Sequence, residues 1–248
     1  MSHPLSATIC SLMHDLAVGL RSILGNRLVG LYLGGSAAMG DFCEASSDLD
    51  FLAITEGPLS PEDLLAIGML HTELLNEHPL AVRLEGDYAP RHFLVATGTT
   101  VPVPGCERGV FRPKVGEIML SADNIYNVRA SGIPFEGPDP REILPDVTPN
   151  QVRAAVREML TEGPGSCHTP EEAAHGILNL CRSFCTLQSG RPSTKSAGAA
   201  WAMENLEPQW HPVIQAAMDL RCNGVLDPTQ DLCGAAQELD QHLRQRYL

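Results

Sequence analysis

The sequence has few basic residues for its size. Its 248 residues include 17 Lys and Arg against 30 Asp and Glu, which gives a formal net charge of −13. A field of this sign repels polyphosphate, so we expect no extended nucleic-acid surface and no nucleic-acid partner. The same field attracts cations and therefore favours a small cationic substrate.

The chain also lacks zinc-site patterns, export signals and long apolar runs. None of its eight cysteines forms a Cys-x-x-Cys pair, and no Cys and His residues have zinc-finger spacing. The N-terminus has no basic region, and no apolar run approaches the roughly 18 residues that cross a membrane. We therefore expect a cytoplasmic protein with reduced cysteines and no membrane partner. Its hydrophobic fraction of 44% is ample for a core.

The first part of the chain alternates between helix and strand signals. Apolar residues three and four apart, or a proline suited to a first helical turn, predict helices at residues 5–24, 61–77 and 115–131. Short apolar or alternating runs predict strands at 28–33, 49–55 and 80–85. Residues 86–114 are predicted to form loops with one or two edge strands.

The rest of the chain reads differently. Residues 133–149 hold five prolines and are predicted to form a linker. Beyond it the strand signals vanish, and helices are predicted at 150–161, 170–189, 196–206, 209–223 and 229–247. We therefore predict an α/β (α+β) domain with a mixed sheet over residues 1–147. An all-α helical bundle is predicted over 148–248.

One segment has the residue types of a phosphate and metal site. A strand ends in Gly34-Gly35-Ser36, and a second strand begins with Asp48-Leu49-Asp50. Small residues at such a turn let phosphate oxygens reach backbone N–H groups and the Ser36 hydroxyl. Side chains two apart on a strand share a face, so Asp48 and Asp50 project together and can hold one or two Mg²⁺ ions. Asp-x-Asp alone is typical of a solvated turn, but the combination is far more specific.

A third carboxylate follows on the next predicted strand. If the strands are neighbours, Glu85 reaches the face of Asp48 and Asp50. It could serve there as a metal ligand or as the base that takes a proton from an attacking hydroxyl. Asp87 is the weaker candidate for the same roles.

This arrangement resembles the nucleotidyltransferase superfamily of the polymerase-β type. The helical half is more specific, because Gln188–Glu204 and Pro208–Ile214 look like the C-terminal domain of the aminoglycoside adenylyltransferases that act on streptomycin and spectinomycin. Residues 132–140 are similar to the linker of those proteins. The resemblance covers roughly residues 20–245.

The resemblance implies transfer of AMP from Mg·ATP to a drug hydroxyl, and hence antibiotic resistance. By position, Gly35 and Ser36 hold phosphate, Asp48 and Asp50 bind two Mg²⁺ ions, and Glu85 is a base or a further metal ligand. Lys195 matches a lysine that reaches the ATP phosphates. The implied partners are ATP and a cationic aminoglycoside-like acceptor, and a monomer is favoured.

The sequence departs from the family in one respect and leaves two alternatives open. Both tryptophans, Trp201 and Trp210, lie in the helical half, whereas the family usually carries a tryptophan in the substrate cleft of its N-terminal domain. The first alternative is a nucleotidyltransferase of the same fold that acts on another metabolite or on a protein hydroxyl. The second is a non-catalytic nucleotide-binding regulator, which would not need three acidic residues.

Overall fold

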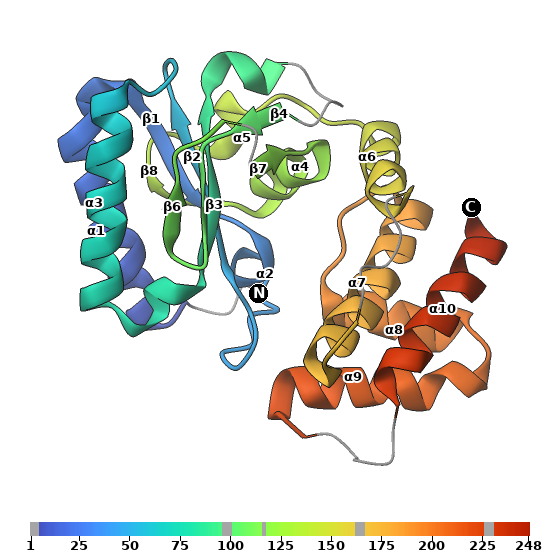
Figure 1. The fold of residues 1–248 in the computed structure, drawn as a ribbon. Coiled ribbons are helices and arrows are strands. Elements are labelled where there is room, and N and C mark those ends of the chain that lie inside the picture. Colours follow the sequence, from blue (N-terminus) through green and yellow to red (C-terminus); the bar gives the residue numbers. More distant parts are fainter. Residues whose placement is uncertain (1–4, 96–100, 116–117, 162–166, 226–230) are drawn as a thin grey trace. The chain divides into compact units, whose positions relative to one another are not determined.

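The computed structural model describes residues 5–95, 101–115, 118–161, 167–225 and 231–248. The chain forms two compact units. The first consists of residues 1–42 and 47–147, and the second of residues 43–46 and 148–248. Figure 1 shows the mixed sheet of the first unit and the helices of the second. The predicted fold class, a mixed-sheet α/β unit and an all-helical unit, is confirmed.

The first unit is built on a six-stranded sheet with the order β6-β5-β3-β2-β1-β8. Its strands are β1 Leu28–Leu33, β2 Leu49–Thr55, β3 Leu84–Pro90, β5 Gly105–Glu107, β6 Val110–Arg112 and β8 Ile133–Glu136. The pair β2 and β3 is parallel, and the other pairs are antiparallel. A separate pair joins β4 (Val101–Val103) to β7 (Ile118–Leu120).

Helices cover this sheet. They are α1 Ala7–Leu24, α2 Gly35–Ala38, α3 Pro61–Glu77, α4 Ala122–Ser131 and α5 Pro140–Ile143. Helices α1 and α3 lie side by side on one face (Figure 1). Ser60 caps α3 in a capping box with Asp63, and Pro61 occupies the first turn, as the sequence predicts.

Helix α1 is a core helix. Among the described residues, the stretch Ala7–Arg27 is the one candidate long and apolar enough to cross a membrane. Its Leu12, Leu16 and Leu20 are fully buried in the core of the first unit. Core helices of proteins that lie outside membranes pass the same length and composition test, so this one helix is weak evidence for a membrane span.

The predicted start of the third strand in the first unit is wrong. Residues Pro79–Arg83 form a 3₁₀ helix, and the strand predicted at 80–85 begins only at Leu84. Val82 is 53% exposed, so the alternation that predicted the strand did not reflect burial. As a result, Glu85 is the second residue of β3, and the strand continues through Asp87.

The segment predicted as a linker begins with a strand. Residues Ile133–Glu136 pair antiparallel with β1 at the edge of the sheet, and the Tyr32 hydroxyl donates a hydrogen bond to the Pro138 carbonyl. Proline is tolerated on an edge strand because one side of its backbone needs no partner. The proline-rich segment 133–149 therefore contains an edge strand of the sheet in addition to the connection between the two units. Likewise, the predicted helix at 115–131 begins only at Ala122, after β7.

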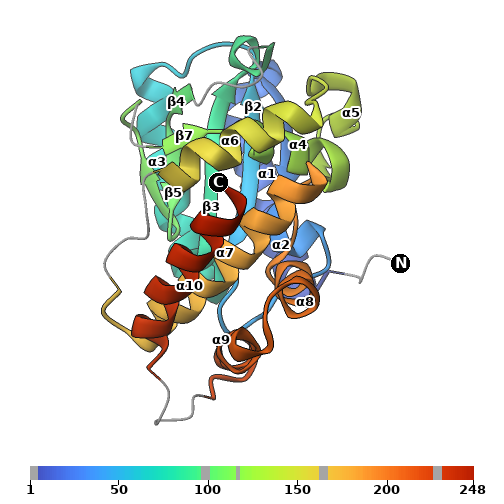
Figure 2. The same ribbon diagram turned by 90° about the vertical axis from the view of Figure 1, so that its right-hand side faces the viewer.

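The second unit is all helical among its described residues. Its helices are α6 Pro149–Thr161, α7 Pro170–Ser189, α8 Lys195–Asn205, α9 His211–Asn223 and α10 Leu232–Tyr247. Figures 1 and 2 both show α7 and α10 side by side. Thr169 forms a capping box with Glu172 at the start of α7, where the sequence predicts a helix start. All five helices predicted after residue 149 are confirmed within one to three residues at their described ends.

The expectation that all cysteines are reduced is wrong for one pair. A disulfide joins Cys167, just before α7, to Cys233 in the first turn of α10, and their Cα atoms are 5.8 Å apart. The two residues are 66 positions apart along the chain. Their spacing carries no signal of pairing, because only the packing of α10 against α7 brings them together.

A small residue on α8 allows α7 and α8 to pack closely. A Cβ atom on Gly198 would lie 2.5 Å from the Arg182 backbone, whereas a Cβ on Gly176 of α7 would meet nothing within 4 Å. We expect Gly198→Ala to lower the free energy of unfolding by about 1–3 kcal/mol through overpacking. The control Gly176→Ala should raise it by about 0.5–1 kcal/mol, because alanine is the better helix former. Chemical denaturation monitored by circular dichroism measures both, and equal effects of the two changes would contradict the close packing at Gly198.

A buried polar pair lies in the core of the first unit. Nε2 of His71 is 2.6 Å from the Tyr88 hydroxyl, and the rings of Phe51 and Phe111 stack on the imidazole. Burial lowers the pKa of His71 to about 4 from its ordinary 6.5. The folded protein therefore binds fewer protons than the unfolded chain between these values, so this histidine lowers stability as the pH falls from 6.5 to 4.

We predict that His71→Gln removes this dependence. The stability advantage of the wild type over the variant should shrink by up to about 3 kcal/mol between pH 7 and pH 4. Urea denaturation across this range measures the difference. The comparison with the variant is needed because Glu85 and Asp87, whose pKa values are raised to about 7, increase the stability of the folded protein as the pH falls through the same range. Their effect is the same in both proteins and cancels in the difference. A constant difference across the range would contradict the prediction.

Candidate active site

The turn after β1 is held by two hydrogen bonds to other elements, β2 and α4. The N–H of Gly34 donates to the Asp50 carbonyl at 2.8 Å, and the N–H of Gly35 donates to Oδ1 of Asn127 on α4 at 3.1 Å. Ser36 is the second residue of the short helix α2 and is half-buried. The turn and its serine therefore lie next to β2, where the sequence places the first pair of acidic residues.

Gly35 is required by the position of the Asp50 side chain. Its φ of +56° lies in the left-handed region, which disfavours other residues. A Cβ atom at this position would also collide with the Asp50 carboxylate. The glycine thus lets the turn approach the acid closely. A phosphate bound at the turn and a cation bound at Asp50 could then belong to the same bound molecule.

Parallel pairing of β2 and β3 brings the acidic residues together. Asp50 is the register partner of Glu85, and Leu52 is the partner of Asp87. Because register partners on adjacent strands face the same side, Asp50, Glu85 and Asp87 share one face of the sheet. Asp48 immediately precedes β2 and is half-buried. Asp50 and Glu85 therefore lie side by side near the start of two neighbouring strands, and Asp87 lies two residues further along the same face.

Burial and neighbouring negative charges raise the pKa of two of these acids, Glu85 and Asp87. Burial, and then the charges of Asp48 and Asp50, raise the pKa of Glu85 to about 7. Burial and the charge of Asp50 raise the pKa of Asp87 to about 7 as well. Oδ1 of Asp87 is buried and has no hydrogen-bond partner among the described residues. A cluster of this kind is stabilised by a cation that neutralises it.

The donor set fits Mg²⁺. Hard divalent cations prefer oxygen ligands, and Asp48, Asp50 and Glu85 supply carboxylate oxygens whose repulsion a cation would relieve. In the described part of the chain, no three acidic, His or Cys side chains are already arranged as a metal site. The chemistry of these carboxylate ligands therefore fits the ion.

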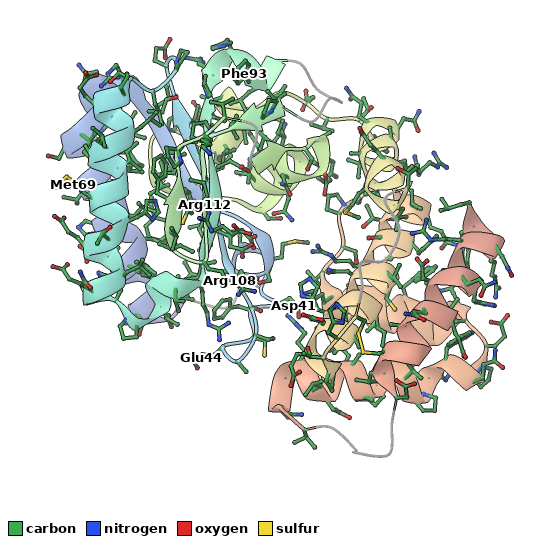
Figure 3. The ribbon with its side chains drawn as sticks, viewed as in Figure 1. Asp41, Glu44, Met69, Phe93, Arg108 and Arg112 are labelled. Carbon is green, nitrogen blue, oxygen red and sulfur yellow. A yellow bond between two sulfur atoms is a disulfide. The ribbon has the colours of Figure 1, made fainter. Side chains whose placement is uncertain are left out.

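Two residues near this cluster carry no motif in the sequence. Asn127 holds the turn through the hydrogen bond to Gly35 and donates a further one to the Met39 sulfur. Arg108, labelled in Figure 3, lies at the turn between β5 and β6 and lowers the pKa of Glu85 through its charge. Its φ of 49° followed by a φ of 76° at Gly109 is typical of a two-residue hairpin turn. In the sequence, the Arg108-Gly109 dipeptide is the one feature that could have indicated this hairpin turn.

Lys195 belongs to the second unit and is the first residue of α8. Its Nζ lies 3.1 Å from Nδ1 of His175 on α7. Partial burial, together with the charges of Lys195 and Arg182, lowers the pKa of His175 to about 4. The histidine is therefore neutral at pH 7 and accepts a hydrogen bond from the lysine. The positive charges gathered here attract anions such as phosphate.

Known proteins match both the helical half and the whole fold. Residues 142–246 match the family model of the aminoglycoside adenylyltransferase C-terminal domain. Spectinomycin 9-adenylyltransferase of Campylobacter jejuni is 23% identical, over 91% of this chain and 90% of the relative. An aminoglycoside (3'') (9) adenylyltransferase of Klebsiella pneumoniae is 28% identical over 44% of this chain and 41% of its own length.

A solved structure has the same fold over nearly the whole chain. The spectinomycin adenyltransferase AAD(9) from Enterococcus faecialis, solved with ATP and spectinomycin, superposes with a TM-score of 0.72 at 18% identity. The match covers 94% of this chain and 98% of that chain. The two-unit fold of this chain is therefore the fold of that adenyltransferase structure. Residues 142–246 of this chain are similar to the C-terminal domain of the aminoglycoside adenylyltransferases, and most of the chain is similar to a spectinomycin 9-adenylyltransferase.

Proposed function

We propose that this enzyme transfers AMP from ATP to a hydroxyl group of spectinomycin and thereby confers resistance. The observation that carries the proposal is the register of Asp50 with Glu85 beside the Gly35 turn, in a chain whose residues 142–246 match the C-terminal domain of the aminoglycoside adenylyltransferases. The two comparisons that span nearly the whole chain are both with spectinomycin adenylyltransferases, which supports this acceptor over others.

In this proposal the first unit supplies the groups that hold the nucleotide. Backbone N–H groups near Gly35 and the Ser36 hydroxyl bind phosphate oxygens, and Asp48 and Asp50 hold Mg²⁺. When bound, the ion neutralises phosphate charge and favours attack at phosphorus. Lys195 at the start of α8 contributes a further positive charge toward the triphosphate.

Glu85 is assigned the proton transfer. Its carboxylate accepts the proton of the drug hydroxyl as the oxygen forms a bond to the α-phosphorus, and the bond to pyrophosphate breaks. The reaction depends mainly on placing the hydroxyl in line with that bond, so the residues act by holding and orienting. The net charge of −13 favours a cationic drug as the acceptor.

Streptomycin is the acceptor we place second. Both tryptophans lie in the second unit, where Trp210 is buried in the core and Nε1 of Trp201 donates to Gln188. In this family a cleft tryptophan usually comes from the other domain, so the chain lacks that aromatic partner for streptomycin. We also propose that the enzyme works in the cytoplasm, because its co-substrate ATP is a cytoplasmic metabolite, and that it works as a monomer.

A substrate panel tests the proposal. The purified protein is incubated with ATP, Mg²⁺ and either spectinomycin, streptomycin or kanamycin, and pyrophosphate release and the mass of each drug are measured. We expect the mass of spectinomycin to increase by one adenylyl group, with matching pyrophosphate. Release of pyrophosphate with none of the drugs modified would instead indicate another acceptor, and no release at all would contradict the proposal.

A further inference from the structure

The short segment between α2 and β2 is attached to the far end of the sequence. Residues Cys43–Ser46 group with the second unit. The Cys43 thiol donates a hydrogen bond to the Arg221 carbonyl at 3.1 Å, and the Ser46 hydroxyl donates to the same oxygen at 3.0 Å. Cys43 and Arg221 are 178 residues apart, so tertiary packing alone creates this contact. Figure 3 labels Glu44, the residue after Cys43.

The residue after Arg221 is a second cysteine. Cys222 lies in the last turn of α9, and its side chain is hydrogen-bonded to the Cys43 sulfur. Cys43 is half-buried and Cys222 is exposed, and neither is in a disulfide. Two thiols from distant parts of the chain therefore lie side by side within reach of small reagents.

The surroundings of Cys43 favour its reactive form. Burial raises the pKa of its thiol, but hydrogen bonding with Ser46, Cys222 and the Ala45 backbone, together with the charge of Arg221, lowers the pKa below its ordinary value. A thiolate is the nucleophile in thiol oxidation. By contrast, burial raises the pKa of both Cys106 and Cys181 to about 12, which makes them poor nucleophiles.

We propose that Cys43 and Cys222 form a redox-sensitive thiol pair that hydrogen peroxide converts into a disulfide. The Cys43 thiolate attacks one peroxide oxygen, which gives a sulfenic acid and, after protonation of the hydroxide that leaves, one water. The Cys222 thiolate then attacks the Cys43 sulfur, forming the S–S bond and releasing a second water. The pair loses two electrons and two hydrogens to the peroxide, and an added dithiol reverses the reaction.

This bond would attach the segment that leads into Asp48 to the end of α9. It would be a second disulfide of the protein, separate from Cys167–Cys233. The modification does not depend on the proposed function, because its product is detected by mass.

Peroxide treatment followed by mass spectrometry tests the pair. The purified full-length protein is treated with one equivalent of hydrogen peroxide, blocked with iodoacetamide and digested without reductant. We expect the intact mass to fall by two hydrogens before alkylation and a peptide that links Cys43 to Cys222 to appear. Treatment with dithiothreitol should remove that peptide.

Single substitutions separate this pair from the other thiols. Cys222→Ser should abolish the linked peptide and leave a Cys43 sulfenic acid that dimedone traps, and Cys43→Ser should abolish both products. The matched control Cys10→Ser, at an exposed cysteine of α1, should leave the cross-link unchanged. Wild-type protein that accumulates oxidised Cys43 without the linked peptide, or that is not oxidised at Cys43, would overturn the proposal.

Discussion

Replacing Asp50 with asparagine is expected to abolish AMP transfer while the protein stays folded. Asparagine keeps the size of the side chain packed against Gly35 but removes the charge that would hold Mg²⁺ against the triphosphate. Loss of an electrostatic group of this kind costs about 10²–10³-fold in kcat, and loss of the ion itself should cost more. Asp48→Asn is expected to behave in the same way.

The control for this experiment is Glu73→Gln. Glu73 lies on the exposed face of α3, in the same unit, and its substitution makes the same change in charge. It should leave pyrophosphate release near the wild-type rate, and circular dichroism should show all three variants folded. Turnover of Asp50→Asn within a few-fold of wild type at saturating Mg²⁺ would contradict the assignment of Asp50 as a metal ligand.

Replacing Glu85 with glutamine is expected to lower kcat by about 10²–10⁴-fold, the usual loss when a general base is removed. Glutamine keeps the shape of the side chain and its place beside Asp50 on β3. The affinity for ATP should change little, because the nucleotide is held mainly by other groups. Steady-state kinetics with spectinomycin and calorimetric titration with ATP separate the two effects.

Two further variants test whether the loss of kcat is specific to Glu85. Glu107→Gln removes a neighbouring charge on β5, paired with Arg112, and should leave kcat nearly unchanged. Lys195→Ala should raise KM for ATP, with a smaller loss of turnover. If Glu85→Gln instead abolished ATP binding, Glu85 would act as a metal ligand alone. The base would then have to be sought at the buried Asp87.

The sequence by itself determined the elements that depend on local chemistry. Strands β1 and β2 and helices α1 and α3 lie where apolar spacing, and Pro61 in the first turn of α3, predict them. Local turn chemistry also placed Gly35 and Ser36 after a strand, and Asp48 and Asp50 at the start of the next. These features depend on residues a few positions apart, so a single sequence carries them.

Only the tertiary structure decided which distant segments meet. The parallel register that sets Asp50 opposite Glu85, the edge strand β8 and the hydrogen bond from Gly35 to Asn127, 92 residues away, have no counterpart in local spacing. The same holds for Cys43 and Arg221. Such contacts form because packing the sheet and the helices buries apolar surface and leaves backbone and polar groups to find partners across the chain. Which distant segments come into contact therefore depends on the packing of the whole chain.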